Sequence, residues 1–247
     1  MRALYNNIVM TADMTFETEN LNYPADNLLD TRQSRYYRTL LNTAQRITFE
    51  KTAAEASYVV IMNHNLSPTA TVKLQADDTD VTSTPDFDET LDVDDIIILN
   101  FTKDTYNFWS LYIDDPDNTD DYIQIAYIFI GDFLQLPGMK PDQTLPFGTT
   151  SKSALSTGGQ VFGSHGYEYR GPADFNFPFV TDTQRKAINT LFAAVRNYIP
   201  FVLLIWANDL DFEPPIYAMI TNSDLKWAKS DNVLYPWKVT LQIREVF

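Results

Sequence analysis

The stretch Thr181–Trp206, which reads TDTQRKAINTLFAAVRNYIPFVLLIW, decides the fold of the second half of this chain. Thr181 can cap a helix with its side-chain hydroxyl, and Gln184, three residues later, can reach back to close a capping box. Apolar residues then recur at steps of three and four, which places them on one face of a helix: Ala187, Ile188, Leu191, Phe192 and Val195. We therefore expect an amphipathic helix over about residues 182–198.

The pattern changes from helix to strand at Pro200, because proline cannot continue a helix and pushes the preceding residue towards extended geometry. Phe201–Trp206 is a continuous apolar run, which predicts a strand buried on both faces. Trp237–Phe247 alternates apolar and polar residues and predicts a half-buried strand. Phenylalanines also alternate on one predicted face ahead of the helix: Phe175, Phe177 and Phe179.

The first half of the chain carries a β pattern without long helices. Apolar or alternating runs are separated by turns rich in Asn, Asp, Pro and Ser, which favours an antiparallel sandwich. The six predicted strands are Arg46–Glu50, Ser57–Met62, Thr71–Ala76, Asp95–Leu99, Trp109–Ile113 and Ile123–Ile130. The predicted fold class is mainly β, with a jelly-roll-like β-sandwich followed by a β-rich domain that has one packed amphipathic helix.

A change in composition marks the predicted domain boundary. Three prolines come first, at 137, 141 and 146, and a Thr/Ser/Gly run from Thr149 to Gly159 follows them. A loop of this length inside one compact domain is unusual. We therefore expect a sandwich domain over residues 1–136, a linker over 137–159 and a β-rich domain over 160–247.

The composition limits the function classes. The chain has 247 residues, 45% of them hydrophobic, which is enough for a core. Its 33 acidic and 18 basic residues give a net charge of −15, which argues against nucleic acid as a partner. The acidic surface either serves solubility, faces a basic partner or binds a divalent cation. No secretory signal or membrane-spanning run is apparent, and there is no cysteine for disulfides or thiolate chemistry.

Catalytic motifs are missing from the sequence. The two histidines, His64 and His165, lie in predicted turn or linker segments, and no G-x-S-x-G motif accompanies them. No phosphate-binding loop or dinucleotide fingerprint occurs either, so we expect no enzyme and no cofactor. A carboxylate pair for glycoside hydrolysis stays open, because separation in space decides that chemistry.

An acidic segment places side-chain oxygens at every second position from 115 to 121, and its calcium candidates are Asp115, Asp117 and Asp121. The EF-hand pattern requires Gly where Asp120 stands and Glu where Ala126 stands, so it fails at both positions. A solvated acidic hairpin is the alternative interpretation.

Basic residues alternate with tyrosines near the start of the chain. Arg32, Arg35 and Arg38 surround Tyr36 and Tyr37, which suggests either a ligand patch or, more simply, arginines paired with neighbouring carboxylates.

The first half resembles the galactose-binding-like, discoidin-type β-sandwich over about residues 1–136. The residues that carry the resemblance are Tyr23–Asp30 (YPADNLLD), Arg46–Glu50 (RITFE), Tyr58–Leu66 (YVVIMNHNL), Val72–Ala76 (VKLQA) and Tyr122–Phe133 (YIQIAYIFIGDF). Sandwiches of this type often bind sugars, so the resemblance implies a carbohydrate-binding module as one hypothesis. The glycan-binding candidates are then Asp26, Tyr36 and Tyr37.

The combination with the second half resembles bacteriophage tail proteins of the distal tail or baseplate type. The matching stretches are Pro200–Leu204 (PFVLL) and Trp237–Val246 (WKVTLQIREV). This resemblance implies a non-enzymatic virion component, assembled in the host cytoplasm, that forms a ring, as a trimer or hexamer, and contacts tube, hub or fibre proteins. A glycan-hydrolysing enzyme is the third hypothesis.

Aromatic residues in the second half are candidates for the interfaces of such an assembly, because aromatics are enriched at interface cores. They are Trp206, Trp227, Tyr235 and Trp237. The alternative is that the tryptophans fill the core.

Overall fold

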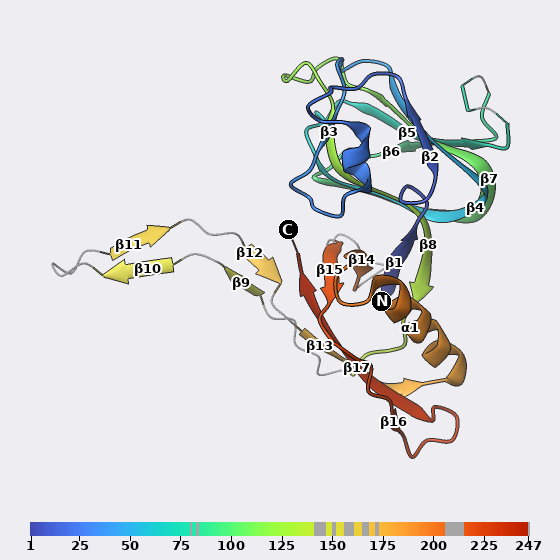
Figure 1. Cartoon of the computed structure of the whole chain (residues 1–247), viewed down its shortest axis with the longest axis vertical. Coiled ribbons are helices and arrows are strands. Elements are labelled where there is room, and N and C mark those ends of the chain that lie inside the picture. The colour runs from blue at the N-terminus through green and yellow to red at the C-terminus, as the bar shows by residue number, and fades with distance from the viewer. Residues whose placement is uncertain are drawn as a thin grey trace. The chain divides into compact units, whose positions relative to one another are not determined.

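The computed structural model describes residues 1–79, 81–82, 84–140, 147–149, 152–155, 161–164, 168–170, 173–205 and 215–246. The chain divides into two compact units. The first unit comprises Arg2–Leu134, and the second comprises Gln135–Asn208 and Ile216–Val246, together with Met1. We describe each unit by itself (Figure 1).

The first unit is built from antiparallel strands in the order β1-β8-β4-β7-β5-β6, with β2 on β4 and β3 on β8. The strands are β1 (Arg2–Asn7), β2 (Asp13–Phe16), β3 (Tyr37–Arg38), β4 (Gln45–His64), β5 (Thr71–Asp77), β6 (Phe87–Leu91), β7 (Ile96–Asp114) and β8 (Gln124–Gln135). A short 3-10 helix, η1, spans Ala25–Leu29.

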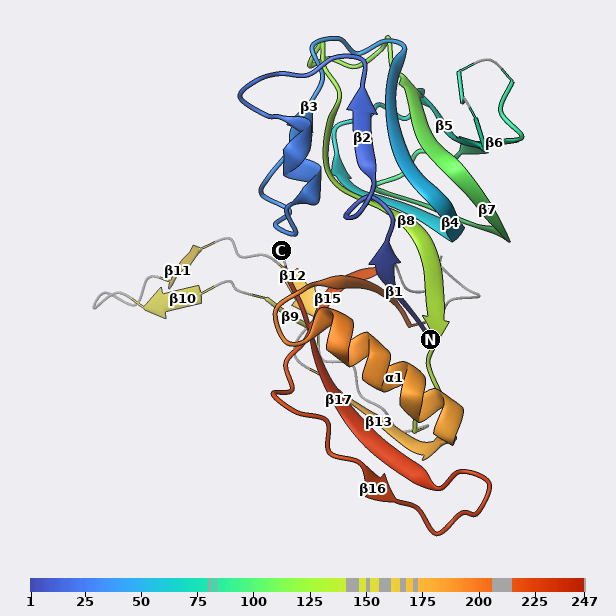
Figure 2. The same cartoon turned by 45° about the vertical axis from the view of Figure 1, so that its right-hand side comes forward.

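Two long strands, β4 and β7, connect the two layers of this sandwich (Figure 2). The first part of β4 pairs with β2 and the end of β7, whereas its second part pairs with β8 and the start of β7. Register shifts between Glu50 and Ala54 and between Ala56 and Tyr58 let β4 bend. One core then fills the space between the layers, with Phe49, Val59 and Ile128 all fully buried.

The predicted β-sandwich is therefore confirmed, but two pairs of predicted short strands are continuous. Arg46–Glu50 and Ser57–Met62 belong to β4, and Asp95–Leu99 and Trp109–Ile113 belong to β7. The polar residues that separate these predicted strands do not form turns. They lie where β4 and β7 bend, and they continue the pairing of the two strands, as Glu55 of β4 does with Thr105 of β7.

Asn7 at the end of β1 holds the start of the chain to β8. It is only 7% exposed. Its side-chain amide donates to the carbonyl of Ile128 at 2.7 Å and accepts from the backbone N–H of Ile130 at 3.1 Å and of Val9 at 3.2 Å. The side chain thus replaces backbone hydrogen bonds where β1 ends.

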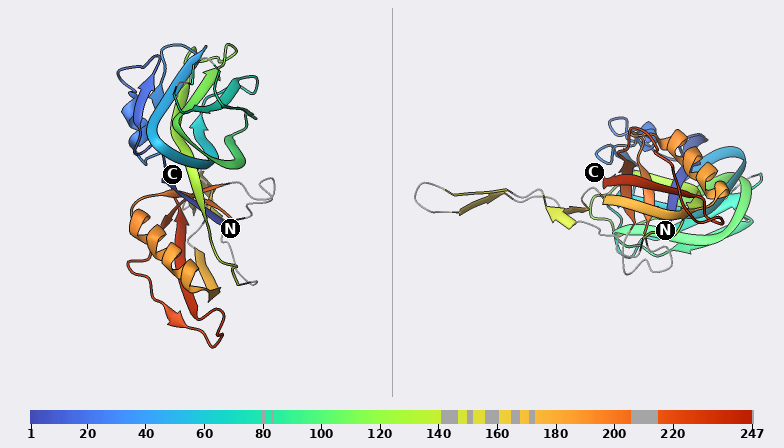
Figure 3. Two further views of the ribbon diagram at one scale, coloured as in Figure 1. Left: turned by 90° about the vertical axis from the view of Figure 1, so that its right-hand side faces the viewer. Right: turned by 90° about the horizontal axis from the view of Figure 1, so that it is seen from below.

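The second unit contains a sheet in the order β13-β17-β15-β14, with β16 on β17 and the helix α1 beside it (Figure 3). These elements are β13 (Ala173–Val180), α1 (Asp182–Val195), β14 (Phe201–Leu204), β15 (Ile216–Ile220), β16 (Ala228–Lys229) and β17 (Trp237–Glu245). Two further ribbons pair β9 (Phe147–Thr149) with β12 (Glu168–Arg170), and β10 (Lys152–Leu155) with β11 (Val161–Ser164).

The predicted helix is confirmed, including its capping box. The backbone N–H of Gln184 donates to the Thr181 hydroxyl at 3.2 Å, and the Thr181 N–H donates to Gln184 Oε1 at 3.0 Å. Ile188, Leu191 and Val195 are buried, as the periodicity predicts. The helix ends at Val195, three residues before the predicted end, because Arg196 takes a positive φ of 49°.

The prediction that the three phenylalanines ahead of the helix lie on one face is only partly correct. Phe175 and Phe177 are buried, but Phe179 is 53% exposed. The pairing of β13 with β17 shifts register between Phe177 and Val180, so Val180 takes the buried place instead.

Parts of the predicted linker lie outside the described residues, namely 141–146, 150–151 and 156–159. Among the described residues, no helix has the length and apolar character needed to cross a membrane.

Candidate functional site

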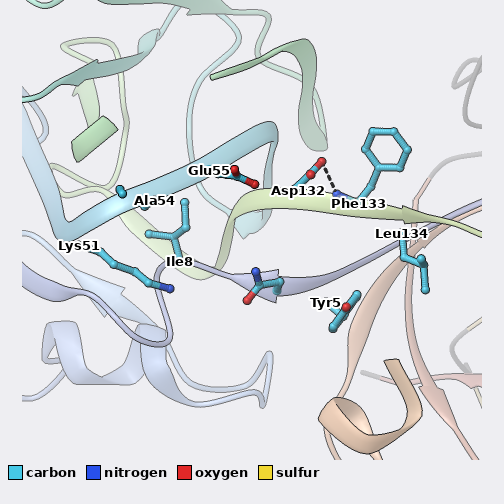
Figure 4. A pocket seen from close by; sticks show the side chains of 10 residues that line it. Tyr5, Ile8, Lys51, Ala54, Glu55, Asp132, Phe133 and Leu134 are labelled. Carbon is cyan, nitrogen blue, oxygen red and sulfur yellow. Dashed lines mark hydrogen bonds between the residues drawn. The ribbon is translucent and has the colours of Figure 1, made fainter. Parts of the chain in front are cut away.

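A polar pocket of about 360 Å³ lies within the first unit (Figure 4). Strand β1 and the turn after it, the bend of β4 and the end of β8 provide its walls: Tyr5, Asn6, Ile8, Lys51, Ala53, Ala54, Glu55, Asp132, Phe133 and Leu134. Figure 4 shows Glu55 on β4 and Asp132 on the neighbouring strand β8.

The pocket exists because β4 is irregular at this point. Ala53 takes a positive φ of 50°, and its backbone N–H donates at 2.8 Å to the side-chain Oδ1 of Asn107 on β7, not to a backbone carbonyl of that strand. The register shift between Glu50 and Ala54 lies at the same place. A bulge of this kind bends a strand and redirects side chains, which leaves the hollow beside β1 and β8.

Gly131 allows β1 and β8 to approach each other at the pocket. A Cβ atom at this position would lie 2.2 Å from the carbonyl oxygen of Asn6, so no larger residue fits without a backbone shift. The close approach places Asp132, the next residue, at the pocket wall.

Asp132 is held by three donors. The Ser57 hydroxyl and the Phe133 N–H donate to its Oδ1 at 2.6 and 2.8 Å, and the Lys103 ammonium donates to its Oδ2 at 2.8 Å. Burial raises the pKa of Asp132, but hydrogen bonds from Lys103, Ser57 and the Phe133 N–H outweigh it and hold the pKa below its usual value. Asp132 is therefore a carboxylate at neutral pH.

Lys103 also contacts Glu55, with 2.5 Å between Nζ and Oε2, so the two carboxylates share one ammonium group. The hydrogen bonds to Asp132 and Glu55 raise the pKa of Lys103. Burial, and secondarily the charge of Asp132, raise the pKa of the Tyr5 hydroxyl, which therefore stays protonated and able to donate.

This arrangement favours binding over acid catalysis. Glycoside hydrolysis requires one carboxyl group that stays protonated, with a raised pKa. The pKa of Asp132 moves in the opposite direction, and Glu55 is paired with the same lysine. The pocket offers carboxylate acceptors, a phenol donor and the amide of Asn6.

The three glycan-binding candidates do not form one surface. Asp26 is exposed on η1, and Tyr36 is half-buried. Tyr37 is 1% exposed, and its hydroxyl donates to the Thr18 carbonyl at 2.6 Å, so its ring has no face to offer a sugar. Tyr37, predicted as an exposed sugar-binding residue, instead belongs to the core of the first unit, while its neighbour Arg38 on β3 is only partly buried.

The arginines nearby mostly have local partners. Arg32 and Arg35 both pair with Asp30, and the hydrogen bond from Arg32 is the main reason that the pKa of Asp30 falls to about 2. Arg38 instead stacks on two tyrosine rings, 3.8 Å from the centre of Tyr23 and 4.7 Å from that of Tyr122.

The calcium candidates are not brought together. Asp115 is fully buried and accepts from the Ser67 N–H at 2.9 Å and from Asn118 Nδ2 at 3.0 Å, whereas Asp117 and Asp121 are exposed. In the part of the chain that the structure describes, no three His, Cys, Asp or Glu side chains gather as metal ligands.

His64, predicted to lie in a turn with local hydrogen bonds, is the last residue of β4, and only one of its two hydrogen bonds is local. Its Nε2 donates to the Asp94 carbonyl at 2.9 Å, and its Nδ1 accepts from the Leu66 N–H at 3.3 Å. Burial lowers its pKa, against the hydrogen bond to Asp94 and the charges of Asp95 and Asp115. His165 lies outside the described residues.

Of the interface candidates, Trp206 lies outside the described residues, and the other three lie near the surface. Trp227 Nε1 donates to Asn189 Oδ1 at 3.0 Å, and Trp237 Nε1 donates to Asp182 Oδ1 at 2.7 Å, so both rings are tied to α1. Tyr235 is 39% exposed and packs edge-on against Phe179, with 6.1 Å between ring centres.

The sequence does not indicate the polar pocket of the first unit. Glu55 and Asp132 are far apart in the sequence, and only the pairing of β4 with β8 brings them together. The one local signal is Gly131-Asp132, a glycine and an acidic residue that interrupt an apolar run.

Comparisons with known proteins found no matching family model and no matching curated protein. Among solved structures, a fucose-binding module from Streptococcus pneumoniae matches with 10% identity and a TM-score of 0.43, covering 52% of this chain and 99% of that chain. Chitosan-binding module 1 of a Paenibacillus sp. IK-5 chitosanase/glucanase matches with 14% identity and a TM-score of 0.41, covering 51% and 99%.

CpGH89CBM32-5 from Clostridium perfringens, in complex with GalNAc-β-1,3-galactose, matches with 13% identity and a TM-score of 0.41, covering 53% of this chain and 99% of that chain. None of these three structures is a tail protein.

Proposed function

We propose that this chain is a non-catalytic carbohydrate-binding protein and that the polar pocket of its first unit binds a sugar residue. The observation that carries the proposal is the lining of the pocket, in which Glu55, Asp132 and Asn6 stand together with the phenol of Tyr5. Sugar hydroxyls both donate and accept hydrogen bonds, so they match carboxylate acceptors and amide or phenol donors. The volume of about 360 Å³ suits a small ligand.

Glu55 is the residue with the most freedom to contact a ligand. Glu55 is exposed and forms an ion pair with Lys103, whereas Asp132 is already held by three donors. A hydrogen bond from a sugar hydroxyl to the charged Glu55 would be worth roughly 1.5–3 kcal/mol.

Glycan-array screening of the full chain, followed by calorimetric titration with the best-bound sugar, tests the proposal. We expect Glu55→Gln to weaken binding roughly tenfold or more, because it removes the charge and keeps the shape. Glu50→Gln is the matched control, since Glu50 is exposed on the same strand but does not line the pocket. An array with no bound glycan, or a Glu55→Gln variant that binds as the wild type does, would contradict the proposal.

A second candidate function is assembly into a larger structure, of the kind that the resemblance to phage tail proteins implies for a virion. The observation that favours it is an apolar cluster on the second unit, formed by Phe179 (53% exposed), Val233 (92%), Leu234 (77%) and Tyr235 (39%). Such exposure is typical of an interaction surface. Light scattering of the protein, alone and mixed with a tail-tube protein, tests it: a ring or mixed complex supports assembly, and a strict monomer opposes it.

A further inference from the structure

The net charge of the chain is confined to its first half. Residues 1–134 hold 23 acidic and 8 basic side chains, a formal charge of −15, whereas residues 135–247 hold 10 of each. The two units therefore differ sharply in their electrostatics, although the overall composition describes one acidic protein.

Exposed acidic side chains gather at one end of the first unit, in the turns between β6 and β7 and between β7 and β8. We call this group the acidic end: Asp92, Asp94, Asp95, Asp117, Asp120 and Asp121. The end of β4 and the residue after it join the two sets, because His64 donates to the Asp94 carbonyl and Asn65 Nδ2 donates to Asp120 Oδ2 at 3.0 Å. No lysine or arginine of the described residues forms an ion pair with these six carboxylates.

The second unit carries a groove of the opposite charge. It has a volume of about 440 Å³ and is surrounded by Lys140, Lys226 and Lys238; we call it the lysine groove. Its floor includes Asn176 and Thr240, whose hydroxyl donates to Asn176 Oδ1 at 2.6 Å.

The groove lies on the outward face of the sheet. Phe177 and Val239 also line the groove, but their side chains are buried. The polar lining residues of β13 and β17 alternate with them along the strands, so the polar side chains point away from the core of the second unit. Lys226 and Lys238 are exposed, and neither forms an ion pair with an acidic side chain of the described residues. Clustered ammonium groups of this kind repel one another until an anion joins them.

We propose that the lysine groove of one copy binds the acidic end of a second copy. Both surfaces are exposed and their charges are opposite. Among the described residues, neither the six carboxylates of the acidic end nor Lys226 and Lys238 of the groove form an ion pair. Charge complementarity of this kind fixes orientation and speeds association. The contact joins unlike surfaces, so repeating it generates a ring or an open chain of copies.

Sedimentation velocity of the full chain at two ionic strengths tests the proposal first. The Debye length is about 30 Å at ~0.01 M salt and about 3 Å at ~1 M. We expect concentration-dependent oligomers in low salt and monomers in high salt. Association that persists or strengthens in high salt would instead indicate the apolar cluster, and a monomer at both ionic strengths would overturn the proposal.

Charge reversal locates the contact. We expect the Lys226→Glu/Lys238→Glu variant to raise the dissociation constant in low salt by more than roughly tenfold, because like charges then face each other. Lys186→Glu/Lys229→Glu is the matched control, since both lysines are exposed in the same unit but outside the groove. If the control dissociates equally, overall charge and not the groove governs association, and the proposal fails.

A complementary variant provides the decisive result. Asp117→Lys/Asp120→Lys/Asp121→Lys should not associate with itself as the wild type does, but it should form mixed oligomers with Lys226→Glu/Lys238→Glu. Circular dichroism first checks that each variant is folded. Failure of the two folded variants to associate would overturn the proposal, as would a wild type that binds inorganic phosphate at the groove yet stays monomeric.

Discussion

Gly131 shows how one residue without a side chain shapes the pocket. The carbonyl of Asn6 occupies the space where a Cβ atom would stand, 2.2 Å away. Backbone atoms cannot move aside as a flexible side chain can, so this glycine is required by packing and not by a special backbone conformation.

Gly131→Ala should lower the free energy of unfolding by about 3 kcal/mol, because the new methyl group forces β1 and β8 apart. Gly138→Ala is the control, since a Cβ there would meet nothing within 4 Å. Urea unfolding followed by fluorescence measures both variants. If both variants have the same free energy of unfolding, β1 and β8 can move apart without loss of stability, which would contradict the prediction.

At the residue scale, the sequence indicates local partners better than distant ones. The pairing of Arg32 and Arg35 with Asp30 depends on residues nearby in the chain, and it could be predicted. The contact of Glu55 and Asp132 with one lysine depends on strand pairing, which no single-sequence pattern specifies.

At the scale of elements, α1 was predictable because its signals are contained within it. The capping box and the buried positions lie within fifteen residues, and the helix period of 3.6 is unambiguous over this length. Strands β4 and β7 were harder, because their polar middle residues look like turns. Only the bend between two layers explains why those residues remain in a strand.

Leu191→Asp should unfold the second unit or lower its free energy of unfolding by more than about 4 kcal/mol. Leu191 is 0% exposed, so the carboxylate would be buried without a partner. Ala194→Asp is the control on the exposed side of the same helix. Thermal unfolding followed by circular dichroism compares them, and a Leu191→Asp variant that melts cooperatively near the wild-type temperature would refute the assignment of this face.

At the scale of the whole molecule, we predict that residues 1–136 and 160–247 are separable domains. Each of the two units of the structure has its own buried residues, such as Trp109 in the first and Phe175 in the second. A domain with its own core resists proteases, whereas a linker is cut early.

Limited proteolysis should therefore cut first between residues 137 and 159 and release two resistant fragments. Mass spectrometry identifies the cut sites, and proteases of different specificity serve as the control for sequence preference. Early cuts within either fragment, with the segment 137–159 spared, would argue against the boundary.

The hydrogen bonds of Asn7 also bear on how the protein is made. Its partners, Ile128 and Ile130, leave the ribosome long after it does, because more than a hundred residues separate them. At roughly 5–20 residues per second, Asn7 waits on the order of ten seconds before its partners on β8 have been synthesised. During that interval β1 lacks its partner strand, so the sandwich can close only after β8 has been synthesised.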